Sequence, residues 1–139
     1  MNVLNKDNSI HLLNQTVRLL NKKTNETLME FGLFSSQWTI LYCLDKKGQL
    51  SQTEISHYLN VERPTVTRTI RKLEENGWII RTKGEDKREN LISLSEEALE
   101  KMPSIQNKIR TFENEQLGNL TDNEIDTLNA LMKKIMKEV

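Results

Sequence analysis

The chain has 139 residues, and its 20 basic and 20 acidic side chains give a formal net charge of zero. This length suits one domain, or one domain with an assembly arm. The single cysteine, Cys43, excludes an intrachain disulfide and a cysteine-based zinc site. Because the sequence has no run of about 20 apolar residues and no signal-peptide pattern, it predicts a soluble, cytoplasmic protein without a membrane partner.

Charge is unevenly distributed along the chain. Residues 61–90 hold eight Lys and Arg against six acids, whereas residues 96–139 hold six against nine. Only 36% of the residues are hydrophobic and 29% are charged, which leaves few apolar side chains for a large core. Elongated helices that complete their burial in an oligomer suit such a composition.

The stretch 7–30 is largely polar, and its few apolar side chains recur roughly at helical spacing, which predicts a long helix. Two interpretations stay open for it, which are packing against a partner and packing against its own domain. In the stretch that starts at residue 31, a second helix should begin with Ser35 or Ser36 as N-cap and end at Gly48. Cys43 lies inside this apolar helix, either as a small buried side chain or as a redox-sensing thiolate, which would need exposure and a lowered pKa.

The stretch from Leu50 to Leu94 predicts a helix-turn-helix followed by a hairpin. Ser51 and Glu54 form a capping-box pattern at the start of a helix over residues 52–59. The second helix should begin at Glu62 or Arg63 and stop at Asn76-Gly77. The strand candidates 78–80 and 91–94 enclose a charged ten-residue segment, which is either a solvated loop or a wing that touches DNA.

The helix that should begin at Glu62 or Arg63 has two chemically different faces. Val66, Ile70 and Leu73 recur at the spacing of a buried stripe. The opposite face carries basic side chains, and no acidic residue occurs between Arg63 and Leu73. A short helix with an apolar back and a cationic front fits the major groove of DNA.

The C-terminal part predicts two amphipathic helices. Ser95 should cap the first, Pro103 should bend or restart it, and Gly118-Asn119 should end it. Thr121 begins a second capping box, and the apolar stripe that follows it comprises Ile125, Leu128, Leu131, Met132 and Ile135. Together with the N-terminal helix these predict a helical dimerisation layer. The expected fold class is mainly α with a small antiparallel β wing.

The sequence shows no pattern of an enzyme. Its five glycines are scattered at turns, and His11 and His57 are not spaced with acids or thiols for a metal. We therefore expect no catalytic activity, no cofactor and no metal.

The chain resembles the MarR family of winged helix-turn-helix transcriptional regulators. The resemblance covers nearly the whole chain, and its most specific part is Asp86-Lys87-Arg88 followed by Leu91 and Leu94, with Ser95 where the family usually has Thr. It implies a homodimer that binds a pseudo-palindromic operator, usually as a repressor, and in many members a release by a small aromatic or lipophilic effector. The oxidant-sensing branch carries its cysteine in the first helix, so that role does not carry over to Cys43.

The resemblance and the helical pattern together assign the candidate residues. The division expected is a DNA-binding part at 35–95 and dimerisation parts at 1–34 and 96–139. Base edges should be faced by Pro64, Thr65, Thr67 and Arg68, phosphates by Ser51, Arg71 and Lys72, and the minor groove by Arg88, with Asp86 holding the wing loop. Arg63 and Lys87 are further candidates for DNA binding. The alternative from another class is a winged helix that binds a protein and no DNA.

An effector pocket is predicted between the dimerisation layer and the helix-turn-helix. The motive is an aromatic cluster at 31–42 in a chain with only 5% aromatic residues. The pocket would be lined by some of His11, Met29, Phe31, Trp38 and Tyr42. A plain hydrophobic core explains the same cluster equally well.

Overall fold

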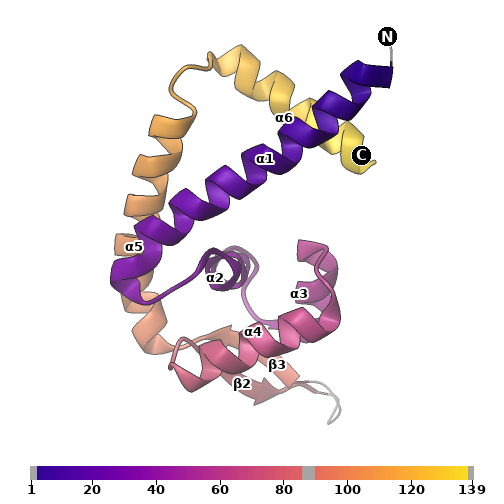
Figure 1. The fold of residues 1–139 in the computed structure, drawn as a ribbon. Helices are drawn as coiled ribbons and strands as arrows, with labels where there is room; N and C mark the ends of the chain where they lie inside the picture. Colours follow the sequence, from indigo (N-terminus) through magenta and orange to yellow (C-terminus); the bar gives the residue numbers. More distant parts are fainter. Residues whose placement is uncertain (1–2, 86–89, 138–139) are drawn as a thin grey trace.

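The computed structural model describes residues 3–85 and 90–137. The fold is mainly α-helical with one small antiparallel sheet, as predicted, and Figure 1 places α4 and the sheet at the end away from both termini. In chain order the elements are α1 (Val3–Leu28), the 3-10 helix η1 (Met29–Phe31), α2 (Ser35–Lys47), β1 (Leu50–Ser51), α3 (Gln52–Leu59), α4 (Arg63–Glu75), β2 (Ile79–Lys83), β3 (Asn90–Leu94), α5 (Glu96–Gln116) and α6 (Asp122–Met136).

The sheet has the order β1-β3-β2, with β3 antiparallel to both neighbours. In its register Leu50 and Arg81 both lie opposite Ile92. The hairpin strands extend farther toward the tip than the predicted strands, because backbone pairing continues through polar residues such as Thr82 and Lys83. Apolar alternation marks only the part of a strand that is buried, so it underestimates the paired length.

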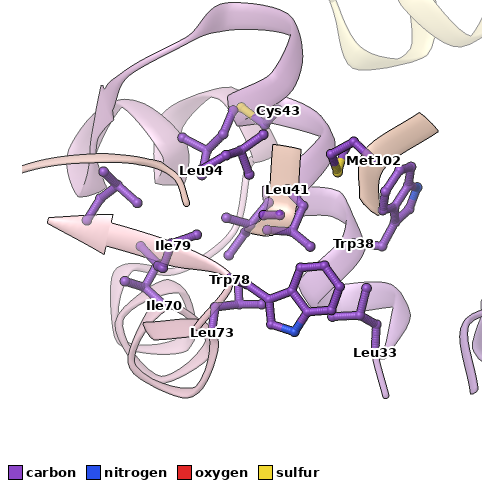
Figure 2. Packing of buried hydrophobic residues seen from close by; sticks show 14 of the residues in the cluster. Leu33, Trp38, Leu41, Cys43, Ile70, Leu73, Trp78, Ile79, Leu94 and Met102 are labelled. Carbon is purple, nitrogen blue, oxygen red and sulfur yellow. The ribbon is translucent and has the colours of Figure 1, made fainter. Parts of the chain in front are cut away.

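One hydrophobic cluster holds the winged part together. Figure 2 shows side chains from α2, α4, the hairpin and α5 pointing into it, including Leu41, Ile70, Ile79 and Met102. Leu28 at the end of α1 belongs to the same cluster. The helices that flank the helix-turn-helix therefore share its core.

One predicted helix boundary, the N-cap of α2, is wrong. The N-cap of α2 is Phe34, and the side-chain Oε1 of Gln37 accepts the Phe34 N–H at 2.9 Å. The Ser35 N–H donates to the side-chain oxygen of Asn25 in α1 at 2.6 Å, so a distant residue replaces the serine cap. Of the two outcomes predicted for Pro103, a bend or a restart of the helix, the restart is wrong, since α5 runs through this residue without interruption.

The terminal helices leave much apolar surface uncovered within one chain. None of the residues of α6 is buried, and Leu128, Leu131, Met132 and Ile135 are between 37% and 57% exposed. The first helix packs on its own domain at its C-terminal end, where Leu28 is buried, whereas Ile10 and Val17 stay exposed in the single chain. Within residues 3–85 and 90–137, no helix combines the length and the apolarity needed to span a bilayer.

Candidate nucleic-acid interface

The capping box at the start of α3 forms as predicted. The Glu54 N–H donates to the Ser51 hydroxyl oxygen and the Ser51 N–H donates to the Glu54 carboxylate, each at 3.1 Å. At the other end of α3, Asn60 adopts the left-handed conformation with φ of 53°, which Asn tolerates better than most residues. The Val61 N–H then donates to the Ser56 carbonyl at 3.1 Å, and this tight turn fixes where α4 begins.

The two faces of α4 differ in burial as the sequence predicts. Val66, Ile70 and Leu73 are at most 1% exposed, which anchors the helix by its back. The basic side chains of the front are exposed, and none of them is ion-paired with an acid in the part of the chain that the structure describes. The front residues are Arg63, Pro64, Arg68, Arg71 and Lys72. This face therefore presents uncompensated positive charge.

Thr65 and Thr67 of α4 are both half-buried but contact different groups. Arg68 Nη2 lies 3.3 Å from the Thr65 hydroxyl oxygen, so Thr65 contacts an exposed guanidinium. Thr67 is partly buried, and its hydroxyl lies 2.9 Å from the Arg63 carbonyl and 3.2 Å from Gln52 Oε1 in α3. Thr67 thus connects the two helices, and Gln52 is a residue of this surface that the sequence did not identify.

The base of the hairpin is fixed by polar contacts. Arg81 Nε donates to both carboxylate oxygens of Glu74 at 3.1 Å, and the Ser95 hydroxyl donates to the Gly77 carbonyl at 2.7 Å. Gln49 Nε2 donates to the Thr82 hydroxyl at 2.9 Å. The sequence offered no local signal for the Glu74–Arg81 pair, because its members lie on different elements. The predicted wing residues Asp86, Lys87 and Arg88 lie outside the described residues.

The five residues predicted for an effector pocket are not gathered in one place. Trp38 is buried in the core and its ring centroid lies 6.0 Å from that of the exposed Tyr42, while Phe31 packs partly buried against the core. His11 lies on α1, 18 residues before Met29, a separation of about 27 Å at helical rise.

Met29 instead lines a cavity of about 570 Å³ where α1 meets the start of α2. Its lining combines apolar side chains with two cations and several amide or carboxylate groups, and comprises Arg18, Asn21, Lys22, Asn25, Glu26, Met29, Gly32, Leu33 and Phe34.

Cys43 is a small buried side chain, the first of the two interpretations that the sequence left open. It is 1% exposed, and burial raises the pKa of its thiol, an effect that the positive charge of Lys47 only partly opposes. A thiolate sensor needs the opposite conditions. Within the described ranges, no group of three or more His, Cys, Asp or Glu side chains is placed to hold a metal ion.

Comparisons with known proteins agree with this geometry. Residues 33–90 match the model of the MarR family. The chain is 50% identical over 129 residues to the HTH-type transcriptional regulator YwoH of Bacillus subtilis (strain 168), covering 93% of this chain and 94% of that protein. It is 33% identical over 133 residues to the HTH-type transcriptional regulator PapX of Escherichia coli, covering 91% and 81%.

Solved structures share the fold along nearly its whole length. A cysteine-to-serine mutant of MarR from E. coli, complexed with operator DNA, superposes with a TM-score of 0.82 at 24% identity, covering 97% of this chain and 99% of that chain. A putative MarR family regulator from Listeria monocytogenes complexed with 26mer DNA gives 0.85 at 24% identity, covering 92% and 86%. The sequence relatives establish the family and the structures its fold: the chain belongs to the MarR family of winged helix-turn-helix transcriptional regulators.

Proposed function

We propose that this regulator binds a pseudo-palindromic DNA operator as a homodimer and represses the gene beside it. The observation that carries the proposal is α4, which is held by a fully buried apolar back and presents four exposed cations without acidic partners in the described chain. Double-stranded DNA is a dense array of negative charge, and its major groove admits one α-helix. The structures of relatives complexed with DNA support the same proposal for this chain.

The front of α4 divides into base and phosphate contacts. Arg68 is exposed beside Thr65, and its guanidinium suits a bidentate contact to guanine, with Pro64 packing close to the bases. Arg63, Arg71 and Lys72 would neutralise phosphates. Because the hydroxyl of Thr67 is engaged with α3, we assign it a supporting place at the groove rather than a base contact of its own.

Two further elements would complete the interface with the backbone and the minor groove. Ser51 stands at the N-terminus of α3, where free amide groups and the helix dipole favour a phosphate. On the wing, Lys87 would reach a phosphate and Arg88 the flanking minor groove, with Asp86 holding the loop. The minor groove carries a degenerate code, so a wing arginine reads its width and charge more than its sequence.

Homodimerisation would come from residues 1–34 and 96–139. Apolar stripes on α1 and α6 stay exposed in the single chain, and a two-fold dimer would cover them while presenting two α4 helices to two half-sites. This symmetry is the reason to expect a pseudo-palindromic operator.

Release by a small aromatic or lipophilic effector is the proposed means of regulation. The cavity beside Met29 and Phe34 supports it, because apolar walls stand next to the cationic Arg18 and Lys22, a combination that suits an amphipathic acid. It lies where α1 meets the start of α2, between the dimerisation helices and the DNA-binding part. A bound molecule there would alter how the two α4 helices are spaced.

The test is selection of bound sequences from random DNA, followed by titration of the best site at several salt concentrations. We expect an enriched site with two inverted half-sites and an affinity that falls steeply with salt, by about 0.9 logarithmic units per logarithmic unit of salt for each phosphate contact. Absence of an enriched site together with a flat salt dependence would remove the proposal and favour a protein-binding module.

A further inference from the structure

An ion pair connects α4 to the hairpin that β2 and β3 form. Arg81 Nε lies 3.1 Å from each carboxylate oxygen of Glu74, and the two side chains are 29% and 40% exposed. Glu74 is the penultimate residue of α4, and Arg81 stands in the middle of β2, opposite Ile92 of β3.

The position of this pair matters more than its strength. An ion pair so open to water adds little to folding stability, because solvent and salt screen it. Nearer the turn, the Trp78 N–H donates to the Leu73 carbonyl of α4, and the Ser95 hydroxyl donates to the Gly77 carbonyl just after α4. The pair thus holds the hairpin at a point farther along its length, as Gln49 holds Thr82 from the β1 side.

We propose that the Glu74–Arg81 pair sets the angle of the wing relative to α4, so that Glu74 and Arg81 are positioning residues for DNA binding. Lys83, the last residue of β2, lies about 7 Å beyond Arg81 at the rise of a strand. A rotation of the hairpin about its base displaces every residue toward the tip by an amount that grows with distance. The proposal rests on the proposed function, in which the wing enters the groove beside the half-site.

The positioning role predicts that removing the Glu74 carboxylate weakens DNA binding, whereas Coulomb's law alone predicts that it strengthens DNA binding. This difference makes the proposal testable. A carboxylate on a DNA-facing surface repels phosphates, so its removal should strengthen binding if only charge matters. Glu75 provides the matched control, because it is the next residue of the same helix, is exposed, and forms no ion pair in the described part of the chain. Glu74→Gln and Glu75→Gln therefore make the same change of charge, and only the first breaks the pair.

The experiment compares full-length wild type, both glutamine variants, Arg81→Ala, and the charge swap that combines Glu74→Arg with Arg81→Glu, all on the selected operator. Affinity and hydroxyl-radical protection are measured at two salt concentrations, and melting temperature checks the fold. We expect Glu75→Gln to bind as tightly as wild type or tighter. Glu74→Gln should bind about fivefold to tenfold more weakly, as for the loss of one charge-assisted contact. It should lose protection in the flanking minor groove while keeping protection in the half-site.

The charge swap should restore the flanking protection, since it rebuilds the pair at unchanged net charge. Identical footprints and affinities for Glu74→Gln and Glu75→Gln would overturn the positioning role. So would a swap that stays as weak as Arg81→Ala, which would show that Arg81 contacts DNA directly. A wild type without flanking protection would instead overturn the wing contact of the proposed function, and the positioning role with it.

Discussion

Individual side chains of the DNA-facing part were predictable where periodicity determines their environment. Val66, Ile70 and Leu73 are buried as the helical spacing predicts. Thr67 is different, because its hydroxyl meets Gln52 across the turn, and the partner of a polar side chain depends on how two helices cross. The spacing of residues along one helix predicts the faces of that helix only. It could not predict contacts between elements, such as the ion pair between Glu74 and Arg81.

Cys43 carries a prediction about oxidants. Since the nucleophile is the thiolate, and burial raises the pKa of this thiol, peroxide should not reach a reactive group. Cys43→Ser should leave DNA affinity unchanged with and without peroxide, in gel-shift titrations beside the wild type. An oxidant response that is present in the wild type and absent in the variant would show that Cys43 is a sensor.

The same thiol predicts a pH dependence of stability. The folded protein holds this proton more tightly than the unfolded chain, because the pKa is raised in the folded state. The free energy of unfolding should therefore fall as pH rises above the ordinary thiol pKa of about 8.5. Urea unfolding at several pH values measures it, and Cys43→Ala should show a smaller fall than the wild type. Equal slopes for the two proteins would contradict a buried titrating thiol.

At the scale of elements, helix starts were predictable where the cap belongs to the helix itself. Ser51, Ser95 and Thr121 each accept an N–H from the residue three positions later, as their patterns predict. The start of α2 is different because Asn25 of α1 accepts the Ser35 N–H. The capping residue stands 10 residues before the helix, so the sequence of the helix itself does not predict it.

This difference in capping predicts two different costs. Ser51→Ala should lower the free energy of unfolding by about 1 kcal/mol, since the Glu54 N–H loses its acceptor. Ser36→Ala should change it by less than about 0.5 kcal/mol, because Ser36 is exposed and is not the cap of α2. Urea unfolding of both variants is the measurement. Equal costs, or a larger cost for Ser36→Ala, would contradict the capping assignment.

At the scale of the whole molecule, the composition and the apolar stripes of the terminal helices predicted that a single chain leaves apolar surface exposed. The structure agrees, because α6 buries no residue against its own chain. The shared core was less predictable. The winged part and its flanking helices meet in one hydrophobic cluster through Leu28, Ala98 and Met102. The sequence pattern of each helix does not show which other element these side chains pack against.

The exposed stripe of α6 predicts how the dimer can be broken. Leu131→Lys places a charge in the stripe, whereas Ala130→Lys places the same charge on the opposite, exposed face of the same helix. Sedimentation should show monomer for the first variant and dimer for the second, and deletion of Asp122 to Val139 should behave like the first. A dimer that survives both Leu131→Lys and the deletion would show that α6 is not part of the interface.

The central claim is that α4 reads the DNA sequence while the wing supplies contacts that are largely independent of sequence. The most direct measurement is the affinity of wild type, Arg68→Ala and Arg88→Ala for a panel of single-base operator variants at several salt concentrations. Arg68→Ala should cost about 1–3 kcal/mol at the preferred operator and relax the choice at one base pair of each half-site. Arg88→Ala should weaken good and poor sites by similar factors and flatten the salt slope by about one unit for each ionic interaction with DNA that the substitution removes. If Arg68→Ala weakens all sites equally while Arg88→Ala changes the base preference, the assignment of α4 and the wing is contradicted.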